Sequence, residues 1–279
     1  MDTLVFVGHG GLRLAADAFG PPGAAPVLLL PGGGQTRHSW RRVAEAIAAA
    51  GHRAISLDLR GHGESGWADA GGYAADAFVG DVVEVAAAMP TPPVIVGASL
   101  GGLSAAVAAG ENPGMPLRAL VLVDIVPHAR ADGIAKIRAF MGAGNAGFDS
   151  PEQAAANVTA YLPHRPPRTV ESLASNLRQG GDGRWYWHWD PRFNGEAQER
   201  QGSGFAARMA AALPNITAPT LLVTGLRSEI VDEAGVGRFR ALLPGAEVVG
   251  VRDATHMVAG DANTPFTAAI LSFIARLPR

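Results

Sequence analysis

The sequence predicts an α/β protein with a doubly wound, mostly parallel sheet and an inserted helical cap. Short apolar runs bounded by glycine and proline recur along the chain, and stretches with helical spacing of apolar residues separate them. Apolar runs without polar alternation are typical of strands buried on both faces of a parallel sheet. Strands that alternate with helices indicate βαβ units, which place helices on both faces of one sheet.

Six apolar runs are expected to form strands, at residues 27–30, 54–59, 94–96, 119–123, 221–224 and 248–251. Apolar residues at helical spacing predict helices at residues 40–50, 73–89, 103–109, 236–243 and 264–277. Parallel strands need a long crossover connection, which is usually a helix. These helices therefore fit the connections that the predicted sheet requires.

The alternation of strands and helices stops between Pro127 and about Pro214. Helical segments are expected there near residues 132–141, 151–161 and 170–179, followed by the aromatic run Trp185-Tyr186-Trp187-His188-Trp189. We therefore expect a core in two parts, residues 1–126 and 214–279, with a helical cap at residues 127–213.

The composition excludes several classes of function. The chain has 279 residues, of which 48% are hydrophobic and 17% are charged, so it can bury a large core. A formal net charge of −2 offers no general basic field for nucleic acid or an anionic membrane. The absence of cysteine excludes disulfides, thiol nucleophiles and cysteine-ligated metal sites. No long apolar run and no signal-peptide pattern occurs, so a cytoplasmic location is expected.

The motifs indicate neither a cofactor nor a metal. The pattern G-x-G-x-x-G occurs at residues 61–66 and 142–147, but neither match has both the strand before it and the helix after it that dinucleotide binding needs. His164, His188 and Asp190 lack the spacing of metal ligands. The expected partner is a small-molecule substrate, with no nucleic acid or membrane, and the sequence leaves the oligomeric state open.

The strongest chemical motif is Gly97-Ala98-Ser99-Leu100-Gly101-Gly102, between a predicted strand and a predicted helix. A serine on such a sharp turn is raised above the sheet, and the residues two positions away on either side must be small. Gly97 and Gly101 meet that requirement. Ser99 is therefore the predicted nucleophile.

A serine nucleophile needs a general base. His256 follows the last predicted strand, at its carboxyl end, where α/β sheets build their sites. The other histidines precede Ser99 or belong to the predicted cap. His256 is therefore the predicted base.

With these motifs, the chain resembles the α/β-hydrolase family over essentially its full length. Residues 31–35, Pro-Gly-Gly-Gly-Gln, stand where that family has its oxyanion loop, and residues 58–65, Asp-Leu-Arg-Gly-His-Gly-Glu-Ser, match a common stretch after one of its strands. Two positions depart from the family: Pro31 replaces a histidine, and Thr255 replaces the glycine that commonly precedes the catalytic histidine. The resemblance implies that the backbone N–H groups of Gly33 and Leu100 form an oxyanion hole.

The acid of the expected triad is less sharply indicated. The resemblance implies an acid three residues after Gly225, but Ser228 stands there and Glu229 follows it. We expect Glu229 to orient His256, because a glutamate can do so and its extra methylene absorbs a small change in the loop. Asp124, at the end of the strand after the serine, is the alternative acid, and Asp232 is a third choice.

The predicted activity is hydrolysis of a small ester or lactone through an acyl-enzyme. Gly34, Gln35, Trp40, Trp187 and Trp189 are the expected substrate-binding residues, because they lie near the oxyanion loop or in the aromatic run of the cap. Alternatives are cofactor-free haloperoxidase or perhydrolase activity and C–C bond hydrolysis, which the same residues can perform. The alternative from another class of function is a protein with the hydrolase fold that binds a small molecule without converting it.

Overall fold

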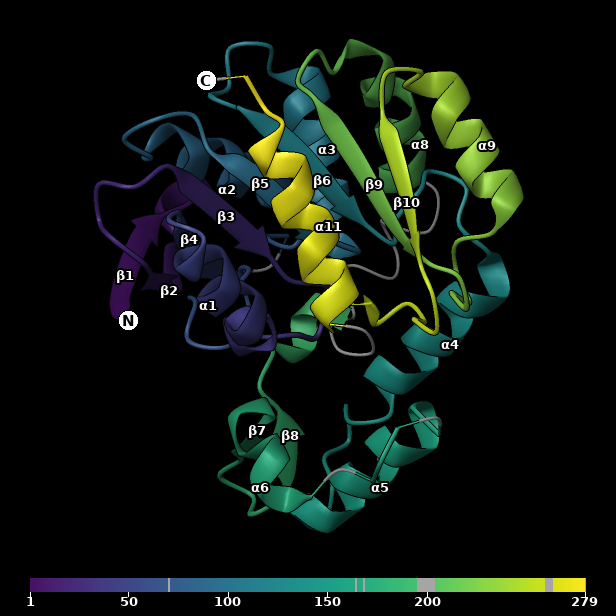
Figure 1. Ribbon diagram of the computed structural model, residues 1–279. Coiled ribbons are helices and arrows are strands. Elements are labelled where there is room, and N and C mark those ends of the chain that lie inside the picture. The colour runs from purple at the N-terminus through teal and green to yellow at the C-terminus, as the bar shows by residue number, and fades with distance from the viewer. Residues whose placement is uncertain (70, 164, 168, 195–203, 259–262, 279) are drawn as a thin grey trace.

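An eight-stranded sheet forms the centre of the protein in the computed structural model, which describes residues 1–69, 71–163, 165–167, 169–194, 204–258 and 263–278 (Figure 1). The strand order is β1-β2-β4-β3-β5-β6-β9-β10. All neighbours from β4 to β10 are parallel, whereas β1 and β2 pair antiparallel with each other and β2 pairs antiparallel with β4. The strands are β1 (Asp2–Val7), β2 (Arg13–Phe19), β3 (Pro26–Leu30), β4 (Arg53–Leu57), β5 (Val94–Ala98), β6 (Ala119–Val123), β9 (Thr220–Gly225) and β10 (Glu247–Val251).

The six predicted strands are present, and they confirm the mostly parallel sheet. Side chains along each central strand alternate between two buried clusters. In β3, for example, Leu28 and Leu30 join the cluster on one face, while Val27 and Leu29 join the cluster on the other. Burial of one such side chain stabilises the folded state by about 1.5–3 kcal/mol. Because both faces of these strands are buried, consecutive apolar residues are favoured.

The hairpin of β1 and β2 was not predicted. β1 lies at the edge of the sheet with much of its length exposed, and β2 is an alanine-rich strand that contains the buried carboxylate of Asp17. A short apolar run does occur at residues 4–7 of β1, but no side chain of this edge strand is fully buried. In β2, the charged Asp17 breaks the apolar pattern, although nearly the whole strand is buried. The expectation of six strands therefore missed both strands of the hairpin.

Helices cover both faces of the sheet, as predicted (Figure 1). α1 and α11 pack against each other on one face, and α2 and α3 pack against each other on the opposite face. The helices of the core are α1 (Arg41–Ala49), α2 (Ala75–Ala87), α3 (Leu100–Glu111), α9 (Glu233–Leu242) and α11 (Asn263–Ala275), with short 3-10 helices η1 (His9–Gly11) and η2 (Arg37–Trp40).

The segment between β6 and β9 interrupts this alternation, and we call residues 127–213 the inserted segment. Figure 1 shows α5, α6, β7 and β8 together beyond one end of the sheet, with α4 between them and the body. The elements are α4 (Ala131–Gly142), α5 (Pro151–Tyr161), α6 (Val170–Leu173), η3 (Ala174–Asn176), β7 (Leu177–Gln179), β8 (Trp185–Trp187) and α8 (Gly204–Ala212), followed by η4 (Leu213–Asn215).

Two features of the inserted segment differ from the expectation. The helix expected at residues 170–179 ends early, because Leu177–Gln179 pairs as an antiparallel strand with Trp185–Trp187. The last helix, α8, packs against α3 of the body, so closely that a side chain on Gly110 would collide with the carbonyl of Ala212. Part of the segment thus belongs to the layer that covers the sheet.

Trp40 lies in the core rather than on a substrate cavity, which corrects its expected role. Its side chain is 1% exposed, and its ring lies 6.0 Å from the ring of Phe266, on the face covered by α1 and α11. The position directly before α1 points it toward the layer between helices and sheet. The aromatic character suggested substrate binding, but the packing assigns Trp40 to stability.

We expect Trp40→Ala to lower the free energy of unfolding by about 3–5 kcal/mol, the range for truncation of a large buried aromatic. Urea denaturation at neutral pH measures this change. Trp67→Ala is the matched control, because Trp67 is 42% exposed, and we expect it to cost less than about 1 kcal/mol. Equal losses in the two variants would contradict the core assignment of Trp40.

Candidate active site

Ser99 occupies a strained turn between β5 and α3. Its backbone has φ 46° and ψ −114°, a conformation that residues other than glycine rarely adopt. A Cβ on Gly97 would lie 2.7 Å from the carbonyl carbon of Gly101, and a Cβ on Gly101 would lie 2.6 Å from the carbonyl oxygen of Leu30. Both positions therefore require glycine, as the motif predicts.

The loop after β3 lies directly over this turn. A Cβ on Gly32 would be 3.4 Å from Cβ of Ser99, and a Cβ on Gly33 would be 3.6 Å from the side chain of Leu100. Leu100 is the first residue of α3, so its N–H has no acceptor within the helix. In the described part of the chain, no acceptor contacts the N–H of Gly33 or Leu100. Two free N–H groups thus lie beside Ser99, where an oxyanion would need them.

His256 lies after β10 and contacts a buried carboxylate. Its Nδ1 atom is 2.9 Å from Oδ2 of Asp124, which follows β6 and is fully buried. Asp124 has φ 48°, and it accepts two further hydrogen bonds: one from the N–H of Gly225 at 2.9 Å and one from the hydroxyl of Ser228 at 2.6 Å. The carboxylate is therefore held rigidly against the imidazole.

Glu229, the expected partner of the imidazole, does not contact the ring. Its Oε2 atom accepts the backbone N–H of His256 at 3.2 Å, and the residue is exposed. Asp232, the third choice, caps α9 by accepting the N–H of Gly235 at 2.7 Å. The His256 ring therefore contacts Asp124 and not Glu229, the residue expected from the sequence.

Ser228 explains this exchange. It occupies the position where the family commonly has its acid, but its short hydroxyl donates to Asp124 from the adjacent loop and supplies no charge. The carboxylate for the imidazole therefore comes from the neighbouring strand β6, which pairs with β9. The serine at position 228 was the signal that could have pointed to Asp124, but Glu229 was expected from the same observation.

Ser99 and His256 open onto one cavity of about 330 Å³. Its lining includes Gly33, Gly34, Gln35, Trp187 and Trp189, five of the residues that the sequence singled out for the site; Trp40 is not among them. The rings of Trp187 and Trp189 stack at 5.3 Å and 18°. Further lining residues that the sequence did not indicate are mostly apolar: Ile137, Phe140, Met141, Val158, Tyr161, Leu162 and Leu173. The wall opposite Ser99 is thus largely apolar and comes from the inserted segment.

A second cavity of about 520 Å³ meets the first at His256, Met257 and Tyr161. Its lining includes Lys136 and Glu229 but not Ser99. Of these two cavities, the smaller one is therefore the candidate substrate site, because it is lined by both Ser99 and His256.

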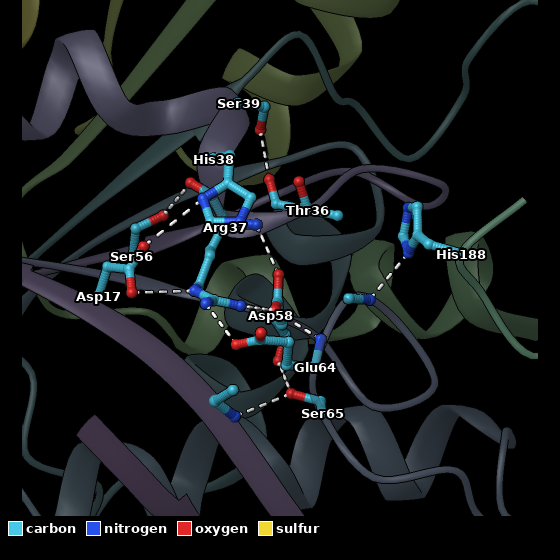
Figure 2. A network of polar contacts seen from close by, with 12 residues as sticks. Asp17, Thr36, Arg37, His38, Ser39, Ser56, Asp58, Glu64, Ser65 and His188 are labelled. Atoms are coloured by element: carbon cyan, nitrogen blue, oxygen red, sulfur yellow. Dashed lines mark hydrogen bonds and ion pairs between the residues drawn. The ribbon is translucent and has the colours of Figure 1, made fainter. Parts of the chain in front are cut away.

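Arg37 lies at the far end of the loop after β3, and Figure 2 shows it among its acidic partners. Its guanidinium pairs with the carboxylates of Asp17, Asp58 and Glu64, and its backbone N–H donates to Asp58 at 2.6 Å. Burial alone would lower the pKa of Arg37, but the surrounding carboxylates, Asp58 foremost, raise it above its usual value. Arg37 is therefore a permanent positive charge in the interior, matched by three acids.

Two buried histidines contact the backbone of Gly34. His62 accepts the N–H of Gly34 on Nε2 at 2.9 Å, and Nε2 of His188 lies 3.3 Å from the Gly34 carbonyl oxygen. Burial lowers the pKa of His62 to about 4 and that of His188 to about 3. Both imidazoles are therefore neutral near pH 7.

No group of three or more potential metal ligands from His, Asp and Glu occurs in the part of the chain that the structure describes. Across the same residues, no helix has both the length and the apolar character needed to cross a bilayer.

Comparison with known proteins connects the chain to a family. Residues 25–262 match the model of the alpha/beta hydrolase fold. An esterase of Mycobacterium tuberculosis is 34% identical over 60% of this chain and 58% of its own length. A 3-hydroxybutyrate-oligomer hydrolase of Cupriavidus necator is 30% identical over 88% of this chain and 87% of its own. The crystal structure of E-2-(acetamidomethylene)succinate hydrolase superimposes with a TM-score of 0.84 at 22% identity, covering 98% of this chain and 100% of that one.

We expect the free energy of unfolding to decrease as the pH falls from about 6.5 toward 5. His62 and His188 have folded pKa values well below that of an unfolded histidine, so the unfolded chain takes up protons first and is favoured at lower pH. The loss approaches about 1.4 kcal/mol per pH unit for each histidine. Urea denaturation at several pH values measures it.

The matched control is His62→Gln, which removes one of the two buried imidazoles that contact Gly34 and should make the free energy of unfolding depend less steeply on pH. An unchanged free energy of unfolding across this pH range would show that the two imidazoles are not held neutral.

Proposed function

Because this chain belongs to the alpha/beta hydrolase fold family, we propose that it is a serine hydrolase that cleaves a small ester or lactone through a Ser99-His256-Asp124 triad. Ester-cleaving enzymes among its relatives support this class of reaction. The observation that carries the proposal is the 2.9 Å contact of His256 Nδ1 with the buried Asp124, beside a cavity onto which Ser99 opens.

The roles of the three residues follow from their contacts. Asp124 accepts a hydrogen bond from Nδ1–H of His256, which keeps the proton on Nδ1 and leaves Nε2 unprotonated as a general base. Nε2 takes the proton of the Ser99 hydroxyl as the oxygen attacks the carbonyl carbon of the substrate. The imidazolium then protonates the departing alcohol, and water activated by the same histidine hydrolyses the acyl-enzyme.

The N–H groups of Gly33 and Leu100 would bind the oxyanion of each tetrahedral intermediate. Among the described residues neither has an acceptor, and Gly33 lies against the side chain of Leu100, the first residue of α3. One such donor typically contributes ~10²–10³ to the rate. The position of Leu100 at the amino end of α3 adds the favourable helix dipole.

The inserted segment would act as a cap that gives the substrate its shape. Trp187 and Trp189 provide a stacked aromatic wall, and Gly34 and Gln35 border the reaction centre. Gln35 accepts the N–H of Gly32 at 3.2 Å and donates to the sulfur of Met257 at 3.3 Å, so its amide links the two sides of the cavity. Such a wall favours an ester or lactone with an apolar acyl part.

We expect Ser99→Ala to abolish hydrolysis of short p-nitrophenyl esters while the fold remains intact, because the variant lacks the nucleophile. Steady-state kinetics and a far-UV circular dichroism spectrum measure the two effects. In the wild-type protein, a fluorophosphonate probe should label Ser99.

Retained activity in the alanine variant would refute the nucleophile. Failure of the probe to label folded wild-type protein would instead favour a protein that binds a small molecule without turnover.

We expect Asp124→Asn to reduce kcat by about 10³–10⁴, because an amide cannot stabilise the imidazolium and can favour the wrong tautomer. Glu229→Gln is the matched control, with the same change from carboxylate to amide at a group that contacts only the backbone of His256. It should change kcat by less than about tenfold. The opposite order of losses would return the role of the acid to Glu229.

A further inference from the structure

Gly34 is held by imidazoles at both of its backbone polar groups. Its N–H donates to Nε2 of His62 at 2.9 Å, and its carbonyl oxygen lies 3.3 Å from Nε2 of His188. The residue has φ +78°, and the N–H of Gln35 donates to the carbonyl oxygen of Gly32 at 3.1 Å. A positive φ at the third position of a four-residue turn is what a type II turn requires. The two imidazoles thus hold the turn that contains Gly33.

The surrounding contacts determine which nitrogen of His188 carries the proton. Nδ1 accepts the N–H of Gly63 at 2.8 Å, a contact drawn in Figure 2. A neutral imidazole that accepts on one nitrogen donates from the other, so Nε2 of His188 carries the proton and faces the carbonyl of Gly34. By the same argument, His62 accepts on Nε2 and donates from Nδ1 to the carbonyl of Arg60 at 2.9 Å.

His188 joins two segments that are far apart in the chain. It follows β8 directly, between the two tryptophans that line the cavity, and it contacts both the loop after β3 and the loop after β4. The adjacent Asp190 fixes the same stretch by separate contacts: its N–H donates to the carbonyl of Gly61 at 2.8 Å, and its carboxylate accepts the hydroxyl of Tyr73 at 2.7 Å. When the imidazole of His188 is replaced, the contacts of Asp190 therefore still attach this part of the inserted segment to the loop after β4.

We propose that His188 is a positioning residue for the oxyanion loop: by donating to the carbonyl of Gly34, it holds the Gly32–Gln35 turn in the conformation that aims the N–H of Gly33 at the oxyanion. The inference rests on the proposed hydrolase function and extends it. Without this donor, the peptide after Gly34 loses one of its constraints, and the Gly33 N–H is less well aligned in the transition state. The loss falls on kcat, because the oxyanion forms only after substrate has bound.

Two substitutions separate the contacts of the imidazole. In His188→Gln, the amide nitrogen can take the place of the Nε2 donor to Gly34. In His188→Asn, the side-chain oxygen can take the place of the Nδ1 acceptor for Gly63, and the donor to Gly34 is lost. We expect His188→Asn to lower kcat by about tenfold or more with KM nearly unchanged, which is less than the ~10²–10³ of a deleted donor. His188→Gln should retain kcat within about threefold of the wild type.

The test measures kcat and KM with p-nitrophenyl esters, and a fluorophosphonate titrates the concentration of active sites. It also measures the inhibition constant of a trifluoromethyl ketone, which forms a tetrahedral oxyanion adduct with the serine. The inhibitor should bind His188→Asn more weakly by the same factor as kcat falls. Tyr73→Phe is the control, because it weakens the attachment of Asp190 and should lower the urea midpoint without changing kcat.

Equal losses of kcat in the Asn and Gln variants, or an effect on KM alone, would overturn the proposal while Ser99 still labels. A wild-type protein that neither labels at Ser99 nor hydrolyses the esters would refute the proposed function, and the role of His188 with it.

Discussion

Arg37 lies in the interior among three carboxylates, and the geometry of the site depends on its pairing with Asp58. Asp58 is fully buried and contacts both the side chain and the backbone N–H of Arg37. It also accepts the N–H of Glu64 at 3.0 Å, so one carboxylate joins the loop after β3 to the loop after β4. Breaking a buried pair by removing one partner typically costs about 3–5 kcal/mol, because the remaining charge stays unpaired. This cost keeps the two loops together.

The same two loops are joined again nearer to Ser99. His62, four residues after Asp58, accepts the N–H of Gly34, and His188 adds a contact from the inserted segment. The loop that carries Gly33 is thus supported at Gly34 and at Arg37. The charged anchor lies at the far end of this loop, whereas the two imidazoles nearer to Ser99 are neutral and add no positive charge there. The rigid support is of the kind that preorganised oxyanion donors require.

Asp124 shows that the carboxylate beside the histidine ring can come from a different strand than the family pattern implies. With Ser228 at the usual acid position, the carboxylate arises one strand away, and the serine hydroxyl becomes one of its donors. Glu229 remains near but contacts the backbone of His256. Three hydrogen-bond donors around Asp124, counting the imidazole, satisfy a charge that would otherwise be too costly to bury.

The sequence alone determined what depends on local geometry and on apolar patterning. The glycines around Ser99 predicted the strained turn because only neighbours without side chains fit it, and the apolar runs predicted six strands because both faces of the sheet are buried. The edge hairpin escaped prediction because Asp17 breaks the apolar pattern of β2, and because β1, at the edge of the sheet, has no fully buried side chain.

Only the tertiary structure decided which distant segments meet. Asp124 contacts His256, which lies 132 positions later in the sequence. Trp40 packs in the core against Phe266, and His188 contacts Gly34. No local pattern encodes these contacts, because each depends on how loops from different strands pack together. Residue type and spacing therefore determined the candidate nucleophile and base, whereas packing determined which carboxylate contacts His256 and which histidines contact Gly34.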